Sequence, residues 1–121
     1  MKFNTRKEGD ILIIELEGRL DVNRSLELEE EVNSLMDEGE KHLLFDLTKL
    51  QYLFSSGLRV FVATIRKLNG MDGNMKMANM SHSVKTVFSV VGLNDLFSNH
   101  NSVDDALKAF QQSESADDDQ E

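Results

Sequence analysis

Two adjacent hydroxyl side chains, Ser55 and Ser56, stand where a buried strand passes through a short loop into a helix. The apolar run 43–47 predicts the strand, and apolar residues at helical spacing from Leu58 onward predict the helix. Unpaired backbone N–H groups and the positive end of the helix dipole stabilise an anion at such a position, so these serines suit a phosphate ester. Either serine can also be the N-cap of the helix, a hydrogen bond worth about 1 kcal/mol, and the two roles are compatible.

The other polar residues argue against direct catalysis. A serine hydrolase requires Gly-x-Ser-x-Gly and a paired histidine, whereas Ser55 lies in Leu-Phe-Ser-Ser-Gly. His42, His82 and His100 are too dispersed for a metal cluster, and the sequence has no Cys. Asp46 alone does not supply the acids and the lysine of a phosphorelay receiver. We therefore expect a binding domain that is not an enzyme and that uses neither a metal nor a cofactor.

Alternating strands and helices position these residues. Period-two apolar residues predict strands, and apolar residues three or four apart predict helices that end near Gly39, Gly70 and Gly92. Ser102, followed by Asp105, resembles a capping box that opens a last helix. This order predicts an α/β fold with right-handed crossovers. The expected elements are a hairpin of strands 3–6 and 11–17, a helix through 28–36, strand 43–47, helix 55–69, strand 74–79, helix 84–91, a short strand near 96–97 and a helix through 103–110.

The composition is that of one domain with an acidic tail. Of the 121 residues, 40% are hydrophobic, which is enough for a single packed core. The net charge of −9 argues against nucleic acid, which requires a clustered basic surface. Residues 111–121 carry five acids, no base and one alanine as their only hydrophobic residue. We therefore predict a domain over 1–110 and a disordered acidic tail over 111–121.

The hydropathy pattern indicates the compartment. No apolar run approaches the ~20 residues of a membrane helix, so we expect no membrane insertion. The first residues alternate polar and apolar side chains without the pattern of a secretory leader, and Cys is absent. These features predict a cytoplasmic protein.

The chain resembles the STAS domains and, within them, the stand-alone anti-sigma factor antagonists. The order and spacing of several short motifs carry the resemblance together. It implies a single domain with a mixed, mostly parallel sheet, opened by a β-hairpin and covered by about four helices. The matching segments are Gly18-Arg19-Leu20-Asp21, Leu44-Phe45-Asp46-Leu47, Ser55-Ser56-Gly57-Leu58, Ser83-Val84-Lys85-Thr86-Val87-Phe88 and Gly92-Leu93.

The resemblance also implies a site. In the family the first serine of the Ser-Ser-Gly motif accepts phosphate, which carries over onto Ser55, with Ser56 as the fallback. The unphosphorylated form binds an anti-sigma factor serine kinase and so releases a sigma factor, a partner switching that regulates transcription. The surface that would meet this partner includes Asp21, Ser56, Gly57 and Lys85. Asp21 can also be a helix N-cap, and Lys85 can also be a solubilising surface residue.

Two residues of the partner surface depart from the family pattern. Phe54 stands where the family usually has aspartate before the acceptor, and Arg59 stands where it has a small residue. Phe54 is either a binding anchor or part of the core, and the usual aspartate favours a ring that faces solvent. Arg59, one turn after Ser55, is suited to pair with a phosphate or with an acid on a partner, or to remain a solvated surface residue.

A second function stays open. A constitutive STAS adaptor, such as a regulatory subunit of a transporter ATPase, would use the same helix surface without phosphorylation. Phe54 in place of aspartate favours this alternative. The protein that co-purifies with the chain would separate the two functions, and the sequence leaves the oligomeric state open.

Overall fold

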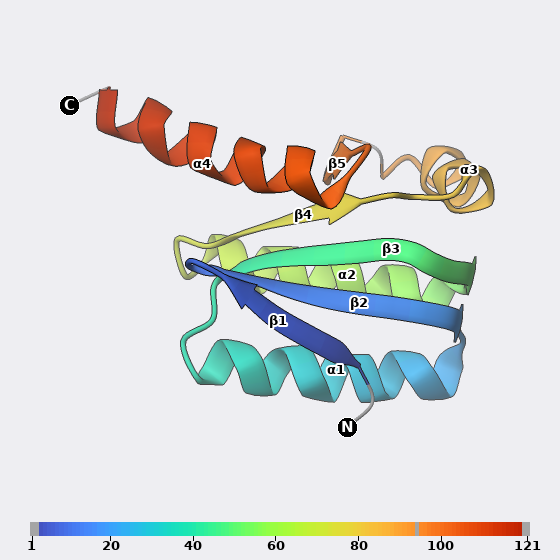
Figure 1. The fold of residues 1–121 in the computed structure, drawn as a ribbon. Coiled ribbons are helices and arrows are strands. Elements are labelled where there is room, and N and C mark those ends of the chain that lie inside the picture. Colours follow the sequence, from blue (N-terminus) through green and yellow to red (C-terminus); the bar gives the residue numbers. More distant parts are fainter. Residues whose placement is uncertain (1–2, 94, 120–121) are drawn as a thin grey trace.

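The α/β alternation expected from the sequence is confirmed in the structure, a computed structural model that describes residues 3–93 and 95–119, with side chains through Gln111 (Figure 1). Its elements are, in chain order, β1 (Asn4–Glu8), β2 (Ile11–Leu20), α1 (Val22–Asp37), β3 (His42–Leu53), α2 (Ser55–Asn69), β4 (Asn74–Ala78), α3 (His82–Val90), β5 (Ser98–His100) and α4 (Val103–Asp119).

The five strands form one mixed sheet in the order β1-β2-β3-β4-β5. β1 and β2 are antiparallel and make the expected hairpin, whose turn contains Gly9 at a φ of +62°. The other neighbouring strands are parallel, which confirms the mostly parallel sheet. β3 is central and long: it pairs with β2 as far as Leu53 but with β4 only over 42–46.

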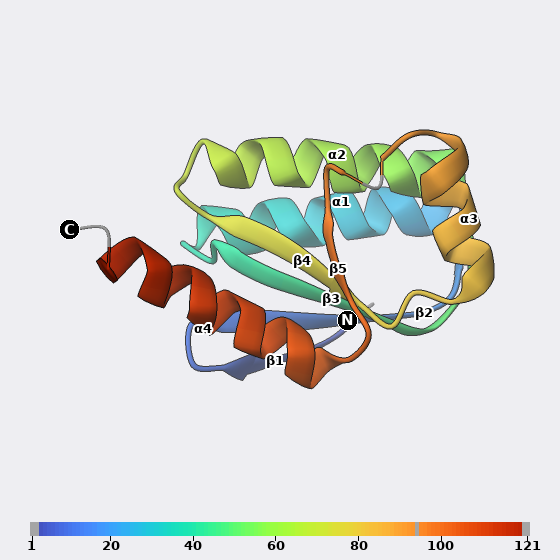
Figure 2. The ribbon, with the colours of Figure 1, turned by 90° about the horizontal axis from the view of Figure 1, so that it is seen from above.

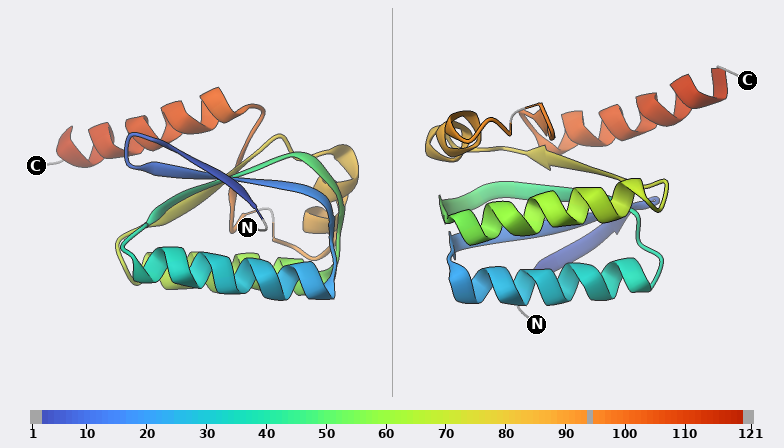
Figure 3. Two further views of the ribbon diagram at one scale, coloured as in Figure 1. Left: turned by 60° about the horizontal axis from the view of Figure 1, so that its bottom comes forward. Right: turned by 180° about the vertical axis from the view of Figure 1, so that it is seen from behind.

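Both faces of the sheet are covered. This explains why the run 43–47 has apolar residues at both odd and even positions, whose side chains point to opposite faces. α1 and α2 lie side by side on one face, and α4 crosses the other face (Figures 2 and 3). Along β3, Leu43 and Phe45 belong to the larger core, whereas Leu44 joins a smaller cluster with α4. The smaller cluster consists of Ile11, Ile13, Leu44, Ala78, Ala106 and Phe110.

The last strand begins slightly later than the sequence predicts. Phe97 is buried, with its ring centroid 5.5 Å from that of Phe88, and β5 begins at Ser98. The apolar pair 96–97 therefore predicts this short edge strand only approximately, because Phe97 fills the core before the strand starts and Leu96 is exposed. None of the described helices is long and apolar enough to cross a membrane.

The start of α4 agrees with the predicted capping residue. The backbone N–H of Asp105 donates to Oγ of Ser102 at 3.0 Å. α4 extends to Asp119 and so enters the stretch 111–121. Residues 120–121 and the side chains from Gln112 onward lie outside the described part of the chain, and the disordered tail stays a prediction.

Candidate functional site

The candidate residues gather where the parallel strands end. β2 ends at Leu20 and is followed by Asp21, and β3 ends at Leu53 and is followed by Phe54 and Ser55. A backbone hydrogen bond joins these two strand ends, since the N–H of Phe54 donates to the carbonyl of Leu20 at 3.1 Å. This end of the sheet, with the starts of α1 and α2, is at the right of Figure 1. Open α/β sheets commonly bind ligands and partners outside the carboxyl ends of their strands.

The N-cap of α2 is Phe54, so the interpretation of Ser55 or Ser56 as the cap is wrong. Phe54 has an extended backbone, with φ −89° and ψ 163°, and its carbonyl accepts from the N–H of Gly57 at 2.9 Å. Helical torsions therefore start at Ser55, one residue earlier than a serine cap requires. No side chain caps this helix, which leaves the N–H groups of Ser55 and Ser56 available to another acceptor.

The two serines differ in their surroundings. Ser55 is exposed, and its hydroxyl makes no hydrogen bond within the described residues. Oγ of Ser56 lies 3.1 Å from Oγ of Ser25, a buried residue of α1, so this pair links the first turns of the two helices. Ser55 is thus the more accessible hydroxyl, and Ser56 has a structural partner.

Gly57 permits the close approach of α2 to the strand ends. A Cβ at this position would lie 2.7 Å from Cδ2 of Leu20 and 2.7 Å from Cδ1 of Leu53. Gly57 is buried, and Leu58 beside it belongs to the core. The glycine therefore sets the position of Ser55 by packing, and a contact between its backbone and a partner stays a prediction.

Phe54 faces outward, with 38% of its surface exposed. Cζ of Arg19 lies 5.5 Å from the centroid of its ring and 5.1 Å from that of Tyr52, which is 58% exposed. Arg19 and Tyr52 are also paired in the β2–β3 register. An outward side chain is what the resemblance predicts, because the family usually has aspartate at the position of Phe54. The role of Phe54 as a binding anchor stays a prediction.

Asp21 caps α1, as the simpler of its two interpretations expects. Its carboxylate accepts a hydrogen bond from the backbone N–H of Arg24 at 3.0 Å. Arg59 is exposed on α2, one turn after Ser55. For both residues, contact with a partner stays a prediction.

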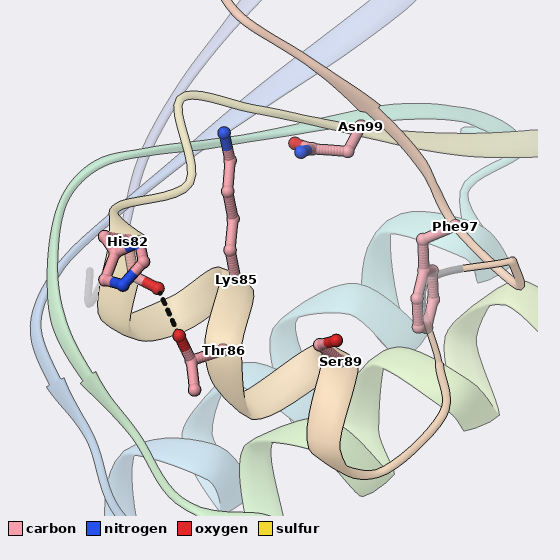
Figure 4. Close-up of a pocket in the computed structure, with 6 residues that line it drawn as sticks. All are labelled: His82, Lys85, Thr86, Ser89, Phe97 and Asn99. Atoms are coloured by element: carbon pink, nitrogen blue, oxygen red, sulfur yellow. Dashed lines mark hydrogen bonds between the residues drawn. The ribbon is translucent and has the colours of Figure 1, made fainter.

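Lys85 lies apart from the serines, on α3. It lines a hollow of about 600 Å³, and Figure 4 shows its side chain extended into the space between His82 and Asn99. The hydroxyl of Thr86, also on this wall, donates to the carbonyl of His82 at 3.0 Å. No described contact joins this hollow to Ser55, so Lys85 would meet a partner only if the partner also covered α3.

Sequence reasoning missed Arg19, Tyr52 and an apolar surface on α1. Val22 and Leu26 are exposed on the first two turns of α1, and the Ser25–Ser56 contact places these turns beside the start of α2. Exposed apolar groups that gather in this way mark interaction surfaces. Tyr52 lies two residues before Phe54 in extended backbone, which puts both rings on one side, but the predicted strand 43–47 stops before both residues.

The residues with shifted pKa values, Lys76 and His100, lie near α4, on the face of the sheet opposite α1 and α2. Burial lowers the pKa of Lys76, whose Nζ lies 5.1 Å from the centroid of the Phe110 ring. Burial and then the charge of Lys76 lower the pKa of His100, and Asp105 partly opposes them. Within the described residues no three His, Asp or Glu side chains are grouped as metal ligands.

Together these features define a small α/β domain whose exposed serine lies at a helix start without a side-chain cap, next to the exposed ring of Phe54. The chain belongs to the STAS domain family, whose model matches residues 2–106.

Two relatives and one solved protein illustrate the similarity. BtrV of Bordetella bronchiseptica, named as an anti-sigma factor antagonist, is 31% identical over 110 residues, which cover 91% of this chain and 95% of BtrV. The anti-sigma-B factor antagonist of Staphylococcus epidermidis is 31% identical over 96 residues, 79% of this chain and 89% of the relative.

The solved protein is the anti-sigma factor antagonist SpoIIAA. In its unphosphorylated form it has a TM-score of 0.80 at 20% identity, covering 91% of this chain and 96% of SpoIIAA. The phosphorylated Bacillus form has a TM-score of 0.72 at 19% identity, covering 89% and 98%. At this level of identity the likeness shows the shared fold.

Proposed function

We propose that this protein is an anti-sigma factor antagonist that a serine kinase inactivates by phosphorylating Ser55. The observation that carries the proposal is the hydroxyl of Ser55, exposed and without a hydrogen-bond partner among the described residues, at the uncapped start of α2. The names of BtrV and of the staphylococcal relative support the antagonist role. The existence of SpoIIAA in phosphorylated and unphosphorylated forms supports a switch of this kind.

The kinase supplies the chemistry, and this chain supplies the acceptor. Oγ of Ser55 forms a bond to the γ-phosphorus of ATP while the bond from that phosphorus to the bridging oxygen breaks. ADP leaves, and the hydroxyl proton passes to a base of the kinase. The antagonist performs no catalysis of its own and needs no cofactor in this scheme, which takes place in the cytoplasm.

The phosphate is expected to change the surface and to leave the fold intact. It adds a charge of about −1.5 to −2 at a helix N-terminus, where the helix dipole stabilises it. The exposed apolar side chains of Val22 and Leu26 on α1, and of Phe54 before α2, suit desolvated contacts with a partner. A dianion beside such a contact opposes its desolvation, so the modified protein releases the kinase, which is then free to hold the sigma factor.

Phosphorylation by the cognate kinase tests this function. Incubation with ATP, followed by mass spectrometry of peptides, is expected to place one phosphate on Ser55. Ser56→Ala is the matched control, because it removes the neighbouring hydroxyl and keeps the acceptor. A Ser55→Ala protein labelled as well as the wild type would refute the assignment.

Phe54 supports a second candidate, a constitutive adaptor that binds through the same surface without modification. An aromatic ring in place of the usual aspartate removes a charge from beside the acceptor and adds an apolar anchor. Affinity purification separates the two functions. A partner with a kinase fold supports the switch, and a transporter ATPase supports the adaptor.

A further inference from the structure

The guanidinium of Arg19 lies over two aromatic rings, those of Tyr52 and of Phe54, the residue before Ser55. Its Cζ lies 5.1 Å from the ring centroid of Tyr52 and 5.5 Å from that of Phe54. The strand register places Arg19 opposite Tyr52 at the ends of β2 and β3. The rings therefore fix the direction of a long side chain that would otherwise sample many rotamers.

This cation has no counter-ion among the described side chains. No described ion pair involves Arg19, and Asp21, two residues after it, caps α1 through the N–H of Arg24 at 3.0 Å. Stacking on exposed rings holds a guanidinium less strongly than a bidentate pair with an oxyanion does. The geometry thus presents a positioned cation that a new anion nearby can recruit.

A backbone contact brings the residue that carries the acceptor hydroxyl close in space to Arg19. Phe54 precedes Ser55, and the N–H of Phe54 is bonded to Leu20, the residue after Arg19, at 3.1 Å. The end of β2 and the start of α2 are therefore fixed relative to each other. We propose that Arg19 pairs with the phosphate of phosphorylated Ser55 and leaves the ring of Phe54 when it does so. This inference rests on the proposed function, because it requires a phosphate at Ser55.

The pairing couples the modification to the aromatic surface. Without phosphate, the guanidinium lies over both rings, and the partner meets a cation flanked by Tyr52 and Phe54. With phosphate, the positive charge is engaged by the dianion, and the ring of Phe54 loses the group that orients it. The switch then alters both the charge at Ser55 and the presentation of the aromatic anchor. A planar fork of N–H donors suits phosphate better than an ammonium group does, so arginine fits this role.

Arg59 provides a matched control. It is also exposed and lies four residues after Ser55 on the same helix, a spacing that allows contact. No described ring or ion pair holds it in place. If Arg19 pairs with the phosphate, removing Arg19 should change the titration of phosphoserine more than removing Arg59 does, although both arginines are exposed near the acceptor.

The test uses the full chain with phosphoserine encoded at position 55, in three forms: otherwise wild type, Arg19→Gln and Arg59→Gln. The ³¹P chemical shift is followed as a function of pH, because a paired cation favours the dianion and lowers its titration midpoint. We expect Arg19→Gln to raise the midpoint by about half a pH unit and Arg59→Gln to raise it clearly less. An unchanged midpoint in Arg19→Gln, or an equal or larger shift in Arg59→Gln, overturns the inference.

A second readout follows the rings. Phosphoserine is expected to shift the aromatic ¹H–¹³C signals of Phe54 in the protein that retains Arg19 and to shift them much less in Arg19→Gln. Equal shifts in both proteins would overturn the release of the ring. Melting curves of the three unmodified proteins check that the exposed substitutions leave the fold intact.

The encoded phosphoserine separates this inference from the proposed function, because no kinase takes part. If the midpoint depends on Arg19 while the kinase neither binds nor modifies the chain, the pairing holds and the proposed function fails. If the kinase assays succeed while Arg19→Gln leaves both readouts unchanged, the proposed function holds and the pairing fails.

Discussion

Replacing Gly57 with alanine tests whether close packing positions the acceptor serine. The added Cβ would lie 2.7 Å from one terminal carbon of Leu20 and 2.7 Å from one of Leu53. Carbon atoms normally pack about 3.5–4.0 Å apart, so each leucine, or α2 itself, must retreat by roughly 1 Å. Leu20 is buried in the core and cannot move freely.

The cost follows from two opposing effects. Overpacking of this kind costs about 1–3 kcal/mol, and alanine returns about 0.5–1 kcal/mol relative to glycine within a helix. The expected net loss, from the midpoints of these ranges, is therefore about 1 kcal/mol, or a fall in Tm of roughly 4–6 °C for a domain of this size. Because the strain lies under the first turn of α2, the rate of Ser55 phosphorylation is also expected to fall.

Gly70→Ala, at the C-cap of the same helix, is the control. A Cβ there would meet nothing closer than the carbonyl of Lys67 at 3.4 Å, and the residue has an ordinary φ of −73°. Its stability is expected to stay within about 0.5 kcal/mol of the wild type. Urea and thermal unfolding of both variants provide the comparison. If Gly57→Ala is as stable as Gly70→Ala, the packing argument is wrong.

Four further predictions concern the site, the other face of the sheet and the tail. Phe54→Ala is expected to weaken kinase binding by about 2 kcal/mol, roughly 30-fold, and to cost far less stability than the 3–5 kcal/mol of a core phenylalanine, as titration and melting curves would show. Ser55→Asp is expected to fold with a nearly unchanged Tm, and a loss as large as that of a core truncation would refute a surface switch.

Because the pKa of His100 in the folded protein lies below its ordinary value of 6.5, the unfolded chain takes up the proton first. Stability is therefore expected to fall as pH drops below about 6.5, and His100→Gln should flatten this part of a urea-midpoint curve. Removing residues 111–121 is expected to leave partner affinity within tenfold at physiological salt, as measured by titration, since their charges act through screened solvent.

The fold was predictable because its signals are local. Both parities of 43–47 are apolar, which indicates a central strand, and the residues near Gly39 and Asn69-Gly70 end two helices. The cap of α2 was not predictable from residue types, because it depends on the extended ψ of Phe54, and helix boundaries are uncertain by a residue.

The aromatic neighbours of the acceptor depend on register. Arg19 and Tyr52 meet only after irregularities between Glu15 and Glu17 and between Gly18 and Arg19 shift the pairing of β2 with β3. A strict period-two pattern does not encode such shifts. The candidate acceptor could thus be found from its motif, whereas the cation beside it required the structure.

The unequal pairing of β3 has a consequence for access to the site. Beyond Asp46 the strand has no ladder to β4, so residues 47–53 continue as a two-stranded ribbon with β2. A hollow of about 650 Å³ opens there between Tyr52 and Ser81. The ends of β2 and β3 therefore reach beyond the end of β4, and a partner that contacts Phe54 and Ser55 has room to lie against the side of this ribbon as well.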